Sequence, residues 1–235
     1  MTENYLKWHS PNLGKDFEML VFGDSGYPLL LFPTSMGRYY ESKDFGLIDS
    51  IRWFIEEGRI KVYCPDSIDT MSWYNKDIPP EQRAYNHTRY DQLLLEEVLP
   101  RMEAETGQQR IVTAGCSFGG YHAANFAFRH PARVSYLFSL SGIFDIRFRM
   151  DGHYDDNVYY NNPADFMSEN QDEDLWRMGI VLGVADEDVA RAQNEQLSGI
   201  LAGKKISHWL DIRPQTRHDW PVWREMLPHY ISLIK

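Results

Sequence analysis

Residues 111–131 read IVTAGCSFGGYHAANFAFRHP, and three glycines fall within six positions, 115–120, of this stretch. An apolar, β-branched run precedes the glycines, and a helical pattern follows them. Glycine weakens both strands and helices, so it is an unusual choice at a junction between two regular elements. The composition therefore predicts either an uncommon backbone conformation or a close approach of two chain segments at this junction.

Gly115-Cys116-Ser117-Phe118-Gly119 matches the pattern G-x-S-x-G between the predicted strand RIVTA and the predicted helix YHAANFAFRH. At a sharp strand-to-helix turn the serine Oγ is pushed above the sheet, and the residues two positions away on either side must be tiny. Gly115 and Gly119 meet this demand. The turn also aims the Phe118 N–H and the start of the helix at one point, where an anion can bind. Ser117 is therefore the candidate nucleophile, and tight packing alone is the alternative.

Strands and helices alternate along most of the chain after an antiparallel pair at residues 4–23. The later strands are expected in YPLLLFP, RIKVYCP, QRIVTAG, RVSYLFSLS, RMGIVLGVAD and KKISHWLDIRP. Helices are expected at 45–58, at about 90–105 with an interruption at Pro100, at 121–130, at 187–203 and at 219–235, while 143–170 reads as irregular. This alternation predicts an α/β fold with a mostly parallel central sheet and helices on both faces. A length of 235 residues fits one domain spanning 1–235.

The charge balance narrows the classes of partner. The net charge is −10 and no basic run occurs, so neither nucleic acid nor a membrane is an expected partner. Cys64 and Cys116 form neither a disulfide framework nor a zinc motif, and the N-terminus does not resemble a signal peptide, so a cytoplasmic location is expected. The acidic stretches CPDSID and YDDN are expected to be solvated loops, and no metal is predicted. The oligomeric state is left open, a homo-oligomer included.

A nucleophilic serine needs a base, and six histidines follow Ser117. Enzymes with this serine turn carry their triad in the chain order Ser, Asp or Glu, His. His218 is the candidate base because it lies in PQTRHDWPVW, the loop after the last predicted strand, where parallel sheets place their sites. The other histidines fall on the helix that follows Ser117, in a strand, on the last helix or in the irregular segment; they are His122, His130, His208, His229 and His153.

The acid that orients the base should follow an earlier strand. IVLGVADED places Asp186 just past the predicted strand end, and Asp186 is the first choice. Asp188 sits where a helix N-cap belongs and is the alternative. Asp145, which follows the strand SYLFSLS, is a third option.

The segment TSMGRYY after LLLFP is expected to supply a second backbone donor to the anion site, from the N–H of Ser35 or Met36. An ordinary glycine-containing turn is the alternative there. Trp73, Tyr74 and Tyr159 are expected to line a substrate pocket, since pockets are usually walled by aromatic residues. Packing within surface loops would explain the same aromatic residues.

The chain resembles the esterase family of the α/β-hydrolase fold that includes esterase D-like enzymes, feruloyl esterases and mycolyltransferases. The resemblance covers about residues 17–233 and is carried by AGCSFGGYHAANFAFRHP, GVAD, ARAQNEQLSGILAGKKI and RHDWPVWREMLP. It implies a serine esterase with Ser117, Asp186 and His218 as its triad, no cofactor and no large cap domain. The chain departs from the family at PTSMG, residues 33–37, which lacks the more usual D-G-type turn.

These observations lead to an expected function. The chain is expected to be a serine carboxylesterase that hydrolyses small or short-acyl carboxylic esters through an acyl-enzyme. Its expected partner is a small-molecule ester. An acyltransferase or thioesterase using the same triad, and a binding protein of the same fold without catalysis, are the alternatives.

Overall fold

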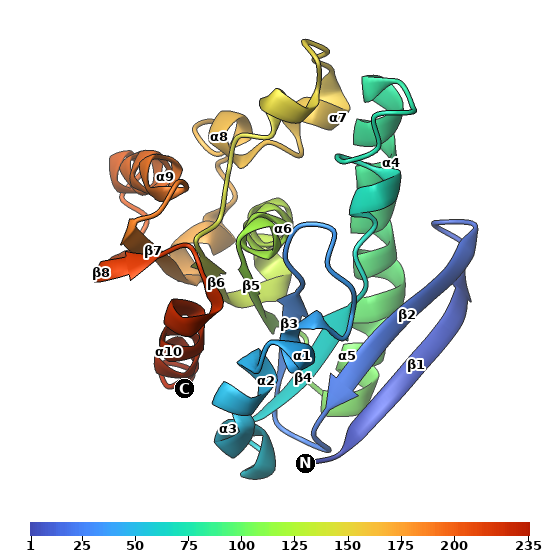
Figure 1. Ribbon diagram of the computed structural model, residues 1–235, viewed down its shortest axis with the longest axis vertical. Helices are drawn as coiled ribbons and strands as arrows, with labels where there is room; N and C mark the ends of the chain where they lie inside the picture. The colour runs from blue at the N-terminus through green and yellow to red at the C-terminus, as the bar shows by residue number, and fades with distance from the viewer.

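A mixed sheet of eight strands runs through the computed structural model, which describes residues 1–235 (Figure 1). Its strands lie in the spatial order β1-β2-β4-β3-β5-β6-β7-β8. Their bounds are Glu3–Ser10 (β1), Lys15–Phe22 (β2), Tyr27–Phe32 (β3), Ile60–Pro65 (β4), Ile111–Cys116 (β5), Val134–Leu140 (β6), Gly179–Glu187 (β7) and Trp209–Arg217 (β8). β1 pairs antiparallel with β2 and β2 with β4, while the pairings from β4 through β8 are parallel. The predicted sheet, with its antiparallel start, is confirmed.

Helices cover both faces of this sheet (Figure 1). Their bounds are Glu41–Asp44 (α1), Leu47–Ser50 (α2), Arg52–Glu56 (α3), Pro80–Leu93 (α4), Leu99–Thr106 (α5), Phe118–Arg129 (α6), Asp156–Tyr159 (α7), Pro163–Phe166 (α8), Arg191–Gly203 (α9) and Trp220–Ile231 (α10). The apolar faces of α4, α5, α6 and α9 belong to one core, and those of α2, α3 and α10 belong to the other. None of these helices has the length and apolar character needed to cross a bilayer.

Strand β3 shows why the central strands read as continuous apolar runs. Leu29 and Leu31 face the core under α2, α3 and α10, whereas Leu30 and Phe32 face the opposite core. Successive side chains of a strand point to opposite faces, so a strand that is covered on both faces needs apolar residues at every position.

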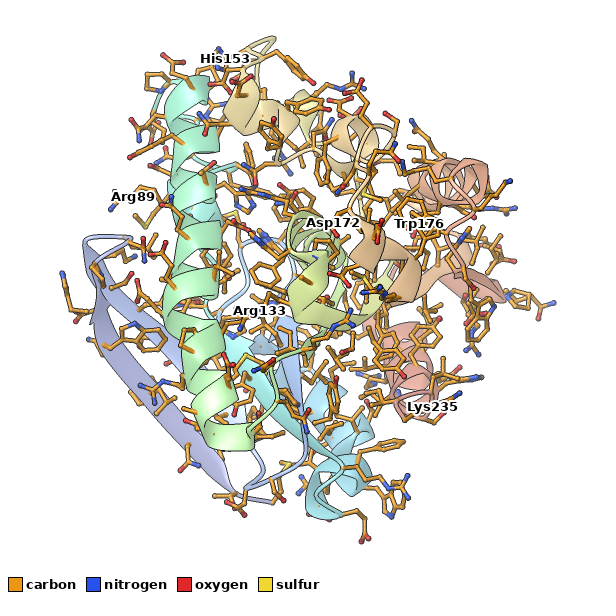
Figure 2. All side chains as sticks on the ribbon, turned by 180° about the vertical axis from the view of Figure 1, so that it is seen from behind. Arg89, Arg133, His153, Asp172, Trp176 and Lys235 are labelled. Carbon is orange, nitrogen blue, oxygen red and sulfur yellow. The ribbon has the colours of Figure 1, made fainter.

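Two expected helices differ in the structure, and the segment 143–170, expected to be irregular, contains the short helices α7 and α8. The expected helix at 45–58 is divided into α2 and α3, because Ile51 lies between them with a φ of −110°. The expected helix at 90–105 begins earlier, at Pro80, a residue whose fixed φ suits the first helical turn. The segment Leu94–Val98 widens to a π-helix just before Pro100, which has no N–H to donate. Figure 2 shows α4 and α5 as one column beside β1 and β2.

The candidate site residues lie at the carboxyl ends of the parallel strands, at one edge of the sheet. Ser117 directly follows β5, Asp188 directly follows β7, and His218 directly follows β8. Parallel strands present their carboxyl ends to the same side, so residues far apart in sequence meet there.

We predict that Gly119→Ala strongly destabilises the fold, because a Cβ at this position would lie 2.5 Å from the Pro33 carbonyl oxygen. Backbone cannot move aside as a side chain can, so the loss should be at least about 1–3 kcal/mol of unfolding free energy. Gly199→Ala is the matched control, since α9 leaves open space around that position. It should gain about 0.5–1 kcal/mol. Urea denaturation measures both, and equal stability of Gly119→Ala and the wild type would contradict the close approach.

Candidate active site

Ser117 occupies the turn between β5 and α6 with a φ of 56° and a ψ of −122°. This conformation is strained for a residue with a Cβ and persists only where the surroundings enforce it. The Ser117 N–H donates to the Leu140 carbonyl at the end of β6, 2.7 Å away. A Cβ on Gly115 would lie 2.3 Å from the Gly119 carbonyl oxygen, so the two flanking glycines are in close backbone contact. The sharp turn expected from the sequence is present.

Three side chains form a continuous hydrogen-bonded series. His218 Nε2 lies 2.9 Å from Ser117 Oγ, and His218 Nδ1 lies 2.8 Å from Asp188 Oδ1. A carboxylate only accepts, so Nδ1 carries the ring proton and Nε2 is left to accept the hydroxyl proton of Ser117. Cys116, next in sequence to Ser117, is buried, and burial raises the pKa of its thiol. Of these two neighbouring side chains, only the Ser117 hydroxyl is partly exposed.

The Asp188 carboxylate is held in its ionised form. Its side chain is fully buried, and burial alone would raise its pKa. The interactions with His218, the Ser141 side chain and the Ala190 N–H, in that order, together outweigh burial and keep the pKa of Asp188 below its usual value. Asp188 thus accepts from the Ala190 N–H in the turn before α9 and also faces the imidazole, whereas the N-cap of α9 is Ala190 and not Asp188 as expected.

Asp186, the first choice from the sequence, does not contact His218. Its carboxylate accepts from the backbone N–H groups of Gln215 and Thr216, at 2.8 and 3.1 Å. Strand β7 extends to Glu187, so Asp186 still lies within the strand and Asp188 is the first residue past its end. The contact expected of Asp186 is therefore made by Asp188.

Asp145, the third option for the acid, is engaged elsewhere. Its carboxylate pairs with Arg147, two residues along the same segment. The remaining histidines are also paired away from Ser117: His122 with Asp69, His130 with Asp91, His153 with Asp155 and His208 with Ser198, while His229 packs beside Trp209. Figure 2 labels His153 in the segment that leads into α7.

The imidazole of His218 is supported from α10. The Trp223 ring meets it edge-on, with ring centroids 5.0 Å apart and an interplanar angle of 86°. The Trp223 indole N–H donates to Ser141 Oγ, 2.9 Å away, just beyond the end of β6. The segment after β6 therefore helps to fix the orientation of the His218 ring through Trp223.

The segment after β3 forms a tight turn beside Ser117. The Gly37 N–H donates to the Thr34 carbonyl, 2.9 Å away, and Met36 at the third position has a φ of 56°. A positive φ at this position is the mark of a type II turn. The Met36 N–H donates to Asp69 Oδ2, 2.8 Å away, whereas the Ser35 N–H has no acceptor within the protein. Of the two expected donors, Met36 is occupied and Ser35 is free.

The Phe118 N–H is the other expected donor to the anion site. It belongs to the first residue of α6, so no intrahelical carbonyl can accept it. The start of a helix also carries partial positive charge. Two free backbone donors, of Ser35 and Phe118, therefore belong to the segments that flank Ser117.

A surface cavity of about 230 Å³ opens over Ser117 and His218. Its other lining residues are Thr34, Ser35, Asp219, Trp220 and Trp223. The Trp220 ring also stacks on Phe45, with centroids 4.7 Å apart, so it forms a flat apolar wall. Trp220 and Trp223 were not singled out from the sequence as pocket residues, although the stretch H-D-W-x-x-W that carries the resemblance contains both.

The three aromatic residues expected in the pocket have different environments. Trp73 is fully buried and lines no part of the cavity, and Tyr159 lines a separate surface hollow near Phe128. Tyr74 is the one beside the site: its hydroxyl donates to Ser35 Oγ, 2.7 Å away, and its ring meets Phe118 edge-on. The expectation that Trp73 and Tyr159 line the pocket rests on residue type alone. Residue type does not determine which side of a loop a ring faces.

The acidic stretch CPDSID also departs from expectation, because Asp69 is completely buried rather than solvated. Glu41 is a second acid missed by sequence reasoning. Its carboxylate accepts from the Thr34 N–H at 2.7 Å and from the Thr34 hydroxyl at 2.9 Å. No group of three or more His, Cys, Asp or Glu side chains is arranged to hold a metal ion.

Comparison with solved structures places this fold among esterases. A ferulic acid esterase superposes with a TM-score of 0.79 at 16% identity, covering 98% of this chain and 95% of the other. An S-formylglutathione hydrolase from Staphylococcus aureus gives 0.74 at 19% identity, covering 98% and 96%. A ferulic acid esterase from the anaerobic fungus Anaeromyces mucronatus gives 0.74 at 13% identity, covering 99% and 90%. No curated protein sequence matches the chain.

At these identities the superpositions establish the α/β-hydrolase fold, and the sequence comparison establishes the family. The model of the family described as "Putative esterase" matches residues 48–232, a range that contains Ser117, Asp188 and His218. The chain belongs to this esterase family of the α/β-hydrolase fold.

Proposed function

We propose that the protein is a serine carboxylesterase in which Ser117, His218 and Asp188 form the catalytic triad. The observation that carries this proposal is the unbroken series of hydrogen bonds from Asp188 through His218 to Ser117, at 2.8 and 2.9 Å. Its chain order, Ser, Asp, His, is the order of the α/β-hydrolases. Membership of the esterase family supports the same assignment.

In the first step, Ser117 Oγ attacks the ester carbonyl carbon while His218 Nε2 takes the hydroxyl proton. Asp188 holds the ring in the required tautomer and stabilises the imidazolium that forms. The carbonyl oxygen becomes an oxyanion, to which the free N–H groups of Ser35 and Phe118 donate. His218 then passes its proton to the leaving alkoxide, and the alcohol departs from the acyl-enzyme.

Water completes the cycle. His218 takes a proton from a water molecule, whose oxygen attacks the acyl carbon and forms a second oxyanion at the same two donors. Collapse of that intermediate returns the proton from His218 to Ser117 Oγ and releases the carboxylic acid. The side chain of His218 is 27% exposed, so solvent water can reach its Nε2 side from the open cavity.

The size of the cavity favours small acyl groups. A volume of about 230 Å³ is below that of most drug-sized ligand sites, and the walls from Trp220 and Trp223 suit an apolar or aromatic substituent. Two of the structural neighbours are named S-formylglutathione hydrolases, so thioesters belong beside oxygen esters in the substrate panel.

A fluorophosphonate probe tests the nucleophile. We expect the probe to label the wild-type protein on a peptide that contains Ser117, because the probe's phosphorus is attacked like an ester carbonyl. Ser117→Ala should abolish both labelling and the hydrolysis of p-nitrophenyl acetate. Unchanged hydrolysis by Ser117→Ala, or labelling at a different serine, would refute the assignment.

The acid of the triad is tested by two matched substitutions. Asp188→Asn should lower kcat by about 10⁴-fold, because an amide no longer selects the tautomer in which Nε2 accepts. Asp186→Asn should leave kcat within about threefold of wild type, since Asp186 binds only backbone N–H groups of β8. Steady-state kinetics with the same ester measures both variants. The reverse order of effects would restore Asp186 as the acid.

A further inference from the structure

Three consecutive residues after β3 differ in whether their backbone N–H groups have an acceptor in the protein. The Thr34 N–H donates to Glu41 and the Met36 N–H donates to Asp69, at 2.7 and 2.8 Å. The Ser35 N–H between them has no acceptor in the protein. A free donor flanked by two bound donors is the arrangement expected of an oxyanion site whose backbone has been fixed in advance.

The hydrogen bond to Asp69 is made by the central peptide of this turn, and the orientation of that peptide determines the turn type. Met36 N–H belongs to the central peptide of the turn from Thr34 to Gly37, and Met36 has a φ of 56°. Glycine adopts such a φ freely, whereas methionine adopts it only under constraint. The hydrogen bond to Asp69 holds this peptide in one orientation and so fixes the backbone on which Ser35 lies.

Asp69 is in turn held by α6, the helix that Ser117 begins. Its Oδ1 lies 3.0 Å from His122 Nε2, and both residues are buried. The carboxylate must accept, so Nε2 carries the ring proton, and His122 Nδ1 has no partner. Phe118 meets the His122 ring edge-on, with centroids 5.0 Å apart. One buried pair therefore joins the Ser35 turn to the helix whose first N–H belongs to Phe118.

We infer that Asp69 and His122 are positioning residues that set the Ser35 N–H relative to the Phe118 N–H, so that both donate to one oxyanion. The inference rests on the proposed ester hydrolysis. Neither residue contacts Ser117 or His218, and neither exchanges a proton with substrate. Their effect is confined to the tetrahedral intermediates and the transition states that flank them, because the bound ester carries no oxyanion.

The direct test is Asp69→Ala, compared with Asp69→Asn as the conservative variant. Asp69→Ala removes the acceptor of the Met36 N–H, and kcat on p-nitrophenyl acetate should fall by about 10²-fold, the loss typical of one oxyanion donor. KM should stay within about threefold. Asp69→Asn keeps an oxygen that can accept from Met36 and should recover most of kcat.

A transition-state analogue separates positioning from a general structural effect. A trifluoromethyl ketone forms a tetrahedral oxyanion on Ser117, so its inhibition constant should rise in Asp69→Ala by about the same factor as kcat/KM falls. His122→Phe keeps a ring of similar size but cannot donate to Asp69, and it should change both quantities in the same direction. It also serves as the test if Asp69→Ala does not fold.

The control is a second Asp–His pair at the other end of α6, in which Asp91 is buried and His130, the C-cap of the helix, is half-buried. His130 lies near the end of α6, with Nε2 2.9 Å from Asp91 Oδ2, and has no contact with the turn. His130→Phe should lower the unfolding temperature but leave kcat unchanged. Equal losses of kcat in His130→Phe and His122→Phe, or a wild-type kcat in a folded Asp69→Ala or His122→Phe, would overturn the inference. Failure of the proposed function itself would appear separately, as a wild-type protein that neither hydrolyses esters nor reacts with the probe at Ser117.

Discussion

The close approach of α6 to the sheet is the constraint on which the rest of the site depends. Gly119 lies against the carbonyls of Phe32 and Pro33 at the end of β3, and this leaves no room for a side chain. The helix therefore begins directly above the sheet, and Ser117 must take its positive φ to connect β5 with α6. The same approach brings the first N–H of α6 to the turn after β3, which makes two backbone donors available beside one hydroxyl.

Much of the fold was predictable because the signals were local. A strand covered on both faces favours apolar residues at successive positions. Such a run is continuous in β3, and one polar residue interrupts it in β4 (Lys61) and in β5 (Thr113). Ser117 and His218 were also accessible, since each directly follows a strand. The carboxylate that contacts His218 was expected to be Asp186 and is Asp188. Glu187 still pairs with Arg217 of β8, and this one extra strand residue moves the position after the strand to Asp188.

The parts that could not be predicted depend on contacts between distant segments. Asp69 lies in an acidic stretch that reads as a solvated loop, yet it is buried by His122, 53 positions away, and by the turn at Met36, 33 positions away. The walls of the cavity come from α10, whose tryptophans look like ordinary core residues in an amphipathic helix. A local sequence pattern does not indicate which buried carboxylate accepts a hydrogen bond from which backbone N–H.

The Asp69–His122 pair of α6 is better explained by position than by stability. Burying a carboxylate is costly, and even a well-bonded buried pair contributes little net stability compared with apolar packing. The attachment of α6 to its core is already provided by its alanine face, at Ala123, Ala124 and Ala127. A polar contact in the first half of such a helix fixes its placement instead: the Asp69–His122 hydrogen bond forms only when the turn after β3 and the start of α6 are in register. The buried Asp69–His122 pair is thus found where the placement of an N–H, rather than the stability of the fold, has to be determined.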